Sequence, residues 1–420
     1  MYFLYSFSNS LGLCLIHQLR EVVSIMLSQE KIDIIKSTVP VLEQHGKTIT
    51  TVFYKNMFEA HPELLNVFNH VNQAQGRQQT ALANTVLAAA KHIDNLGAII
   101  PAVVQIANKH VSLGILPEQY PIVGKYLLGA IKEVLGDAAT PEILGAWEEA
   151  YGIIADAFIG VEKSMYDEMA AEDGGWKLFK GFVLADKIKE SEVITSFYFK
   201  PVDGGKVPTY KPGQYISVKL EIPGEKNTLI RQYSLSQAPN GESFRISVKR
   251  EGENNPNGKA SIFLHDQLNI GDIVELSAPA GDFYLDVESN TPVTLISGGV
   301  GVTPMMAMYE TIATTTPERP VAFLHSARTR SHQAFDKVVR EMDESLATSS
   351  YAALYSEEGD GFINREFLEK NVKEGSDVYV CGPTPFMQAV IKELYAMGID
   401  KEKVHFEFFG PAVQLDLAHA

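Results

Sequence analysis

A glycine-rich turn in the last third of the chain has the spacing of a phosphate-binding site. Gly298-Gly299-Val300-Gly301-Val302-Thr303-Pro304 directly follows an apolar run at residues 293–296, which predicts a β-strand. Pro304 stands where the third glycine of the dinucleotide fingerprint belongs, so we expect Thr303 and Pro304 to cap and open the next helix. The backbone N–H groups at such a helix start bind pyrophosphate, and the turn therefore predicts a dinucleotide site.

The residues after the next apolar run leave the choice of dinucleotide open. The run at residues 321–324 is followed by His325-Ser326-Ala327-Arg328-Thr329-Arg330, with no acidic residue among them. An acid here would hydrogen bond to the ribose hydroxyls of NADH, whereas Arg328 or Arg330 could accept the 2′-phosphate of NADPH. Both nicotinamide nucleotides are therefore candidates.

A four-residue motif in a strand-like run could contact a second phosphate-bearing cofactor. Arg231-Gln232-Tyr233-Ser234 resembles the R-x-Y-S element of the ferredoxin-reductase-like flavoproteins. On that resemblance Arg231 meets the diphosphate of FAD as a bidentate cation, while Tyr233 and Ser234 approach the isoalloxazine ring. Tyr215, in Pro212-Gly213-Gln214-Tyr215, would be a further ring contact. Ordinary strands of an antiparallel barrel would explain the alternation here, but not the arginine within it.

Two shorter motifs accompany it. Gly258-Lys259-Ala260-Ser261 is expected to open a helix whose N-terminus could face a phosphate. Cys381-Gly382-Pro383 matches the C-G-P turn of the same flavoproteins, which follows a strand near the nicotinamide. We expect the Cys381 thiol to be a packing element rather than a nucleophile.

A single histidine stands out in the first third of the chain. His110 lies on an apolar helical stripe, where a lone histidine is more often a hydrogen-bonded core residue than a metal ligand. Its companions favour ligation, because their types and order resemble those of a globin. They are Tyr54 in a helix, Phe68 in a loop, Gln78 followed one turn later by Leu82, and Tyr120 just after the His110 helix.

The spacing of apolar residues predicts the elements that hold these motifs. From residue 26 to about residue 169 apolar side chains recur every three or four positions, which predicts an all-α domain of about six to eight helices. Beyond Asp173-Gly174-Gly175 the period becomes two, as in Phe244, Ile246 and Val248, which predicts an antiparallel β-barrel domain. From about residue 292 apolar runs alternate with helical stretches, which is typical of an α/β domain with a parallel sheet.

The chain of 420 residues is too long for one core and fits several domains. We expect an extension of undetermined role at 1–25, a globin-like domain at 26–166, a linker at 167–175, a β-barrel domain at 176–286 and an α/β domain at 287–420. The extension is apolar but lacks a basic start, a membrane-spanning run and a small-residue cleavage site. It is an upstream-extended start before Met26, a native extension, or a targeting segment.

The composition is that of a globular protein with small-molecule partners. Hydrophobic residues make up 45% of the chain, and its formal net charge of −16 opposes binding to nucleic acid or to an anionic membrane surface. Cys14 and Cys381 are too few for a disulfide framework or an iron–sulfur site, which indicates a reducing compartment. We therefore expect a cytoplasmic monomer without stable membrane association.

Together the motifs resemble those of the flavohaemoglobins, in which a globin is fused to a ferredoxin-reductase-like FAD and NAD module. The resemblance extends from Met26 to Pro411 and implies haem b, FAD and NADH or NADPH as cofactors. The residues that carry it in the first domain are Phe53-Tyr54, Asn72-Gln73, Lys109-His110 and Pro117-Glu118-Gln119-Tyr120.

The resemblance implies a ligand and two supporting residues on the proximal side of the haem. His110 would hold the iron through one ring nitrogen. Tyr120 and Glu162 would hydrogen bond to the other nitrogen, and the carboxylate would give the ring imidazolate character. Without the resemblance, Glu162 reads as a solvated helix residue.

It also implies a distal pocket. Tyr54 and Gln78 would donate hydrogen bonds to bound oxygen, while Phe68 and Leu82 would wall the pocket. The alternative for Tyr54 is a core tyrosine whose hydroxyl is satisfied within the protein.

The last aromatic residues complete the set. Phe406-Glu407-Phe408-Phe409-Gly410-Pro411 resembles the family's final flavin contact, with Phe409 against the ring. Glu407 beside the flavin and Lys109 beside the haem ligand would tune the two redox centres.

The function implied by the resemblance is nitric oxide dioxygenase activity: NAD(P)H reduces FAD, FAD reduces haem, and the ferrous–oxy haem converts nitric oxide to nitrate. The residues alone support only a haem–flavin reductase that handles oxygen. The alternatives are a peroxide or alkylhydroperoxide reductase, a redox or oxygen sensor, and a haem pocket that binds lipid.

Overall fold

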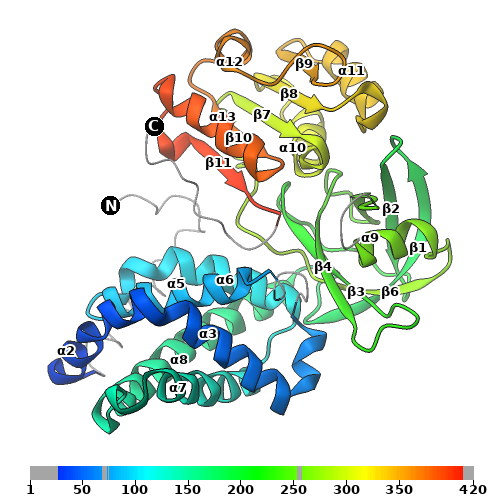
Figure 1. Ribbon diagram of the computed structural model, residues 1–420. Helices are drawn as coiled ribbons and strands as arrows, with labels where there is room; N and C mark the ends of the chain where they lie inside the picture. Colours follow the sequence, from blue (N-terminus) through cyan, green and yellow to red (C-terminus); the bar gives the residue numbers. More distant parts are fainter. Residues whose placement is uncertain (1–26, 69–72, 74, 253–257, 410–420) are drawn as a thin grey trace. The chain divides into compact units, whose positions relative to one another are not determined.

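The computed structural model describes residues 27–68, 73, 75–252 and 258–409. The chain divides into two compact units: a mainly helical one, Met1–Ala170 with the segment Pro223–Ile230, and a second one made of Ala171–Ile222 and the chain from Arg231 onward. Each unit has buried hydrophobic clusters of its own. Figure 1 draws the helices of the first unit in blue to green and the sheets of the second in green to red.

Within the first unit, the described residues up to Ala170 form helices joined by turns, which confirms the predicted all-α domain; the attached segment Pro223–Ile230 is not helical. Its short 3-10 helices are η1 (Pro62–Asn66), η2 (Leu96–Ile99), η3 (Pro117–Gln119) and η4 (Gly136–Ala138). The α-helices are α2 (Gln29–Ser37), α3 (Val39–Ala60), α5 (Arg77–Lys91), α6 (Ile100–Leu113), α7 (Tyr120–Leu135) and α8 (Pro141–Ala171).

Local sequence signals explain where these helices begin. The Ser28 hydroxyl accepts a hydrogen bond from Lys31 N at 3.4 Å and so caps α2. Prolines occupy the first turns of η1, α6, η3, α7 and α8, where a missing N–H group costs no helical hydrogen bond. Ile49, Phe53 and Met57 of α3 are at most 2% exposed and form the centre of the helical core.

One described stretch, Leu96–Leu113, is apolar and long enough to cross a membrane by length and composition alone. It comprises η2 and α6, and Val103 and Ala107 of α6 are buried in a cluster with Phe158 and Val161 of α8. Core helices of soluble proteins pass the same test, so this is weak evidence for a membrane span.

The second unit begins with a six-stranded antiparallel sheet in the order β4-β3-β6-β1-β2-β5. An isolated antiparallel bridge between Leu235 and Ile246 joins its two edges, which confirms the predicted barrel. Helix α9 (Lys259–Asp266) follows β5. The strands are β1 (Phe179–Lys189), β2 (Ile194–Pro201), β3 (Tyr215–Leu220), β4 (Leu229–Ser234), β5 (Phe244–Lys249) and β6 (Ile273–Ser277).

The rest of this unit is a parallel five-stranded sheet, in the order β11-β10-β7-β8-β9, as predicted. Its strands are β7 (Val293–Gly298), β8 (Val321–Ala327), β9 (Ser349–Tyr355), β10 (Asp377–Cys381) and β11 (Val404–Glu407). Helices α10 (Val302–Thr315) and α11 (Asp336–Ser345) pack on one face, and α12 (Arg365–Asn371) and α13 (Thr384–Ala396) on the other.

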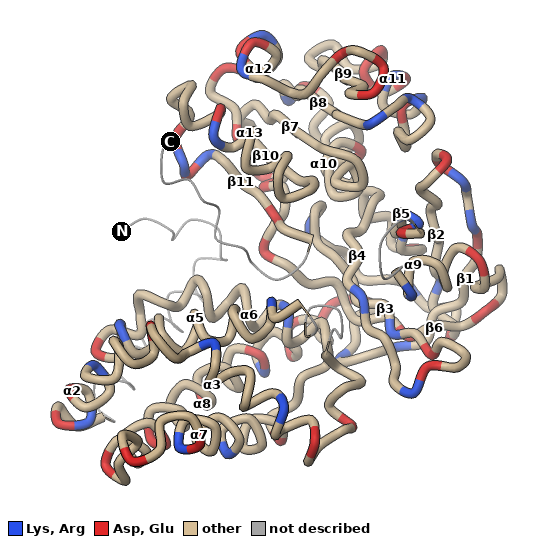
Figure 2. The backbone as a smooth tube through the Cα atoms, in the orientation of Figure 1, with Lys and Arg blue, Asp and Glu red and all other residues tan. Residues whose placement is uncertain are grey.

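The order of this sheet places its ligand site. The chain passes from β7 outward through β8 to β9 and then returns to β10 on the opposite side of β7. Ligands of open α/β sheets bind at the carboxyl ends of the strands where the order reverses, which here is the β7–β10 boundary. Figure 2 shows few charges along β7, β8 and α10, in keeping with their burial.

Candidate functional site

The side chains of His110, Tyr120 and Glu162 come from three helices and meet in one hydrogen-bonded cluster. His110 lies on α6, Tyr120 begins α7, and Glu162 comes from α8. His110 Nδ1 is 2.6 Å from Glu162 Oε1 and 3.1 Å from the Tyr120 hydroxyl. The Tyr120 hydroxyl also donates to Glu162 Oε1 at 2.5 Å. The structure therefore brings together the three residues expected on the proximal side.

Burial orients this cluster. The Glu162 side chain is 3% exposed and that of His110 is 31% exposed, so the carboxylate is buried while part of the imidazole is accessible. Burial and the Glu162 carboxylate raise the pKa of Tyr120, so its hydroxyl stays a donor. Glu162 is thus not a solvated helix residue, and that alternative is wrong.

The cluster fits a haem iron. A carboxylate that accepts from Nδ1–H fixes the proton on that nitrogen and leaves the Nε2 lone pair as a ligand. Among the described residues no group of three His, Cys, Asp or Glu side chains could hold a metal ion by itself. One supported histidine is the donor set expected for iron that a porphyrin already coordinates.

Tyr54 lies on α3, is 8% exposed and packs against aromatic neighbours. Its ring centroid is 5.7 Å from those of Phe58 and Phe68. Burial raises the pKa of Tyr54, so the phenol keeps its proton. Leu82 packs against the same helical core. Tyr54 therefore offers a protonated hydroxyl in an apolar setting.

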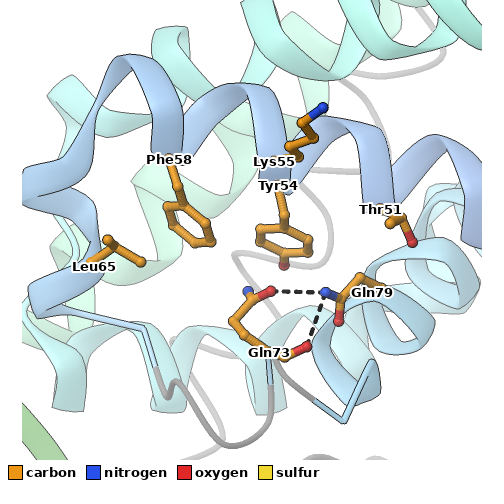
Figure 3. A pocket seen from close by; sticks show the side chains of 7 residues that line it. All are labelled: Thr51, Tyr54, Lys55, Phe58, Leu65, Gln73 and Gln79. Atoms are coloured by element: carbon orange, nitrogen blue, oxygen red, sulfur yellow. Dashed lines mark hydrogen bonds between the residues drawn. The ribbon is translucent and has the colours of Figure 1, made fainter.

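Tyr54 also lines a cavity of about 290 Å³, together with Thr51, Lys55, Phe58, Leu65, Gln73 and Gln79. Figure 3 shows its hydroxyl pointing toward Gln73 and Gln79. Gln79 Nε2 donates to Gln73 Oε1 at 2.9 Å and to the Gln73 carbonyl at 3.2 Å. This amide pair adds a polar wall that our sequence reasoning did not anticipate.

Gln78 does not line that cavity. Adjacent residues of a helix point about 100° apart, so Gln78 and Gln79 face different directions. Among the described residues Gln78 Oε1 has no hydrogen-bond partner although the atom is buried. A buried amide oxygen without a hydrogen-bond donor costs free energy unless another group supplies one. The environment of Gln78 Oε1 therefore fits a polar ligand next to this side chain. The joint distal role of Tyr54 and Gln78 stays a prediction.

The expected flavin residues lie at the junction of β3 and β4. Tyr215 and Ser234 are 5% and 6% exposed, and Leu235 N donates to the Gln214 carbonyl at 2.9 Å, which ties the two strands together. A Cβ atom on Gly281 would come within 2.9 Å of the Tyr215 ring, so only glycine permits this contact. Gln232 is exposed.

Charge at this junction fits a diphosphate. Burial lowers the pKa of the Arg231 guanidinium, since a low-dielectric setting disfavours a cation. Burial likewise raises the pKa of Tyr233, whose hydroxyl stays protonated. A half-buried arginine that interacts electrostatically with Tyr233 is suited to an anionic group joined to a planar ring, as in FAD.

The two glycine motifs of the α/β part meet at the β7–β10 boundary. Ser297 and Cys381 are paired neighbours on parallel strands. A Cβ atom on Gly301 would lie 2.2 Å from the Cys381 carbonyl oxygen, so this position requires glycine for the turns to touch. Cys381 is fully buried and burial raises its pKa, which confirms the thiol as a packing element. Phe386, which we did not predict, covers Gly298 and Gly382.

The expected helix cap at Thr303 is wrong. Helix α10 begins at Val302 with Gly301 as its N-cap, and no side chain caps it. The Thr303 hydroxyl instead donates to the Val300 carbonyl at 3.0 Å. The first N–H groups of α10 are consequently left uncapped by side chains, which is the condition for binding an anion there.

Glutamates accompany the arginines that follow β8. Arg328 Nε lies 4.0 Å from Glu357 Oε1, and Arg330 Nε lies 3.1 Å from Glu358 Oε2. Arg330 N also donates to Glu358 Oε1 at 2.7 Å. The two cations are therefore matched by two carboxylates.

The C-terminal motif is described only in part. Phe408 packs against the cluster that includes β10 and α13, and Phe409 is 48% exposed. Glu407 pairs with Cys381 in the sheet and its carbonyl accepts from the thiol at 3.7 Å. Lys109 is half-buried beside His110. The expectations for Gly410 and Pro411, like those for residues 1–25, lie outside the described residues.

Family models match all three parts of the chain. The globin model matches residues 51–158, the oxidoreductase FAD-binding domain 181–284, and the oxidoreductase NAD-binding domain 295–392. The flavohemoprotein of Bacillus subtilis is 51% identical over 407 residues, which cover 94% of this chain and all of that protein. Flavohemoprotein A of Dictyostelium discoideum is 49% identical over 92% of this chain and 98% of its own.

Solved structures agree. The flavohemoglobin of Malassezia yamatoensis, determined with bound FAD and heme, is 31% identical and has a TM-score of 0.82 over 91% of this chain and 100% of that one. The FAD/NAD-binding domain of nitric oxide dioxygenase from Vibrio cholerae is 40% identical, with a TM-score of 0.52, and covers 55% of this chain and 99% of that one.

Proposed function

This chain belongs to the flavohaemoprotein family, and from that premise we propose that it is an NAD(P)H-dependent nitric oxide dioxygenase, which forms nitrate. Haem, FAD and a nicotinamide nucleotide are its cofactors, and it is an oxidoreductase. The observation that supports the dioxygenase most is the His110–Tyr120–Glu162 cluster. A carboxylate on the proximal imidazole increases electron donation to the iron, which a simple oxygen store does not need.

When bound, the cofactors would supply the redox chemistry. The nicotinamide would supply a hydride, the flavin would pass on its two electrons one at a time, and the haem iron would provide a site for dioxygen and nitric oxide. The protein supplies orientation and charge. Glu162 holds the proton on His110 Nδ1 and keeps Nε2 free for iron. Tyr54, protonated because it is buried, can donate to negative charge that develops on the distal side.

Two rivals use the same residues differently. The proximal carboxylate would also support a peroxide or alkylhydroperoxide reductase, because electron donation to iron favours O–O cleavage. A redox or oxygen sensor is less well supported, since a sensor does not need the reductase domains that supply hydride continuously.

The proposal is tested by stoichiometry. Purified protein with haem and FAD is given NADH and air, and nitric oxide is added in known amounts. We expect two molecules of nitric oxide to disappear for each NADH oxidised, because each conversion to nitrate takes one electron. Oxidation of NADH that is faster with peroxide than with nitric oxide would favour the peroxide reductase.

Arg231 lies on β4, which carries the expected flavin contacts and is called the flavin strand below, and this arginine should contribute strongly to FAD affinity. Arg231→Ala removes one charge-assisted contact to the diphosphate, so FAD binding should weaken by roughly 1.5–3 kcal/mol, or about ten- to a hundredfold. Flavin retained after dialysis, measured by absorbance, checks this. Arg365→Ala, on the exposed surface of α12, is the matched control. Equal flavin retention in both variants would remove Arg231 from the site.

The choice of nucleotide follows from the charges after β8. Glu357 and Glu358 offset Arg328 and Arg330, so a 2′-phosphate gains little there and the wild type should use NADH at least as well as NADPH. Replacing both glutamates by glutamine should raise kcat/KM for NADPH about three- to tenfold, the range for two exposed charges. A wild type that prefers NADPH would contradict this assignment.

A further inference from the structure

A buried ion pair joins the barrel to the α/β part of the second unit. Arg245 on β5 donates from Nη2 to Glu310 Oε1 on α10 at 2.7 Å. The two side chains are only 10% and 20% exposed. The carboxylate helps to hold the pKa of Arg245 above its usual value despite burial. Such a pair is held mostly away from water, so its geometry is more restrictive than that of a surface pair.

Both partners make further contacts that fix their orientation. Glu310 Oε2 accepts a hydrogen bond from Ala238 N at 2.9 Å. Arg245 Nε donates to Ser236 Oγ at 3.2 Å, and Nη2 also donates to the Ser236 carbonyl. The guanidinium lies 5.0 Å from the ring centroid of Phe335, the N-cap residue of α11. The pair therefore connects β5, the segment after β4, α10 and α11.

The place of Glu310 on α10 gives this contact a role in the reaction. In the sequence VTPMMAMYETIATT, which spans α10, Glu310 is the one charged residue, and Figure 2 draws the helix in tan along most of its length. The same helix opens at the glycine-rich turn. Ala238 follows Ser234 of the flavin strand by four positions. The Glu310 carboxylate thus links α10, which begins at the glycine-rich turn, to Ala238 in the segment that follows the flavin strand.

We propose that Glu310 is a positioning residue for hydride transfer, fixing α10 against the flavin strand so that nicotinamide and isoalloxazine meet at reacting distance. In that transfer NAD(P)H gives the flavin a hydride with its electron pair and becomes NAD(P)⁺. Domains within one chain move relative to each other unless their interface restrains them. Reacting atoms must approach to about 3–3.5 Å, and an error of about 1 Å can cost about a hundredfold in rate.

Glu310→Gln tests this with little change of shape. Glutamine has one carbonyl oxygen, so Arg245 or Ala238 N loses its acceptor. Flavin reduction by NADH is followed without oxygen or nitric oxide in the holoprotein by rapid mixing. We expect the limiting reduction rate to fall at least tenfold, with less than threefold change in NADH affinity and full reduction by dithionite. Amide exchange at residues 236–240 should accelerate. An unchanged limiting rate would overturn the proposal.

A double variant separates positioning from stability. Replacing a buried ion pair by apolar residues is often neutral or stabilising. The double variant Arg245→Met with Glu310→Met should therefore unfold at about the same temperature as the wild type. The limiting reduction rate should stay at least tenfold low, and its recovery together with stability would show a merely structural role and overturn the proposal. Glu275→Gln, which breaks the Lys219 pair within the barrel, is the control. Because the assay omits nitric oxide, a result that contradicts the positioning role of Glu310 would not bear on the proposed dioxygenase activity.

Discussion

Replacing His110 with alanine is expected to abolish stable haem binding while FAD stays bound. His110 supplies the one imidazole nitrogen of the proximal cluster that is left free for iron, because the Glu162 carboxylate and the Tyr120 hydroxyl both lie against its Nδ1 atom. Its loss leaves no donor of suitable strength at that place. Soret absorbance and flavin absorbance of the purified variant, measured together, check the result.

The control is His92→Ala, which removes an exposed histidine at the end of α5. It should keep both cofactors. A His110 variant with wild-type Soret intensity would refute the ligand assignment. Loss of flavin and helical circular dichroism along with haem would mean that the substitution had unfolded the protein, so both signals are read on the same sample.

Replacing Tyr54 with phenylalanine is expected to speed release of dioxygen about ten- to a hundredfold. The change removes one hydroxyl from a buried apolar setting and keeps the ring that packs on Phe58 and Phe68. A charge-assisted hydrogen bond to a bound ligand is worth roughly 1.5–3 kcal/mol, which corresponds to that change in rate. Stopped-flow mixing measures it, and nitric oxide consumption should fall as well.

Flavin-level activity provides the internal control for Tyr54. Reduction of an artificial acceptor by NADH should be unchanged, because Tyr54 lies in the helical unit. Tyr126→Phe, on α7 of the same unit, should release dioxygen like the wild type. Release at the wild-type rate from the Tyr54 variant would make Tyr54 an ordinary core tyrosine, and a parallel loss of flavin activity would indicate misfolding.

The proximal cluster shows what sequence can and cannot supply. Residues 110 and 162 are 52 positions apart, and helical periodicity alone favoured a solvated Glu162. Only the family's motif indicated that this carboxylate turns inward, because burial of a charged residue depends on a partner that local spacing does not reveal. His110 itself was recognisable from its apolar helix and its companions.

Secondary structure was predictable where local signals are strong. Prolines lie in the first turns of α6 and α7, where the missing N–H group costs no helical hydrogen bond, so these helix starts are readable from the sequence. The start of α10 was missed because threonine before proline is typical of a cap, yet in this turn Thr303 bonds back to Val300. The close contact of Gly301 with Cys381 required the three-dimensional structure, because it joins strands far apart in sequence.

Contacts between elements distant in sequence account for the rest. Arg245 alternates with Phe244 and Ile246, so the sequence places it on the opposite face of β5 without explaining how an arginine can be buried there. Its partner, Glu310, lies on a helix of the α/β part, 65 residues away.

The measurement that tests the central proposal most directly is isotopic. The holoprotein is supplied with NADH, unlabelled nitric oxide and dioxygen in which both atoms are heavy oxygen, and the products are analysed by mass spectrometry. A dioxygenase must transfer both atoms, so we predict nitrate that carries two labelled oxygens, formed by the wild type and absent with His110→Ala. Nitrite or unlabelled nitrate as the main product, or equal nitrate from both proteins, would contradict the account.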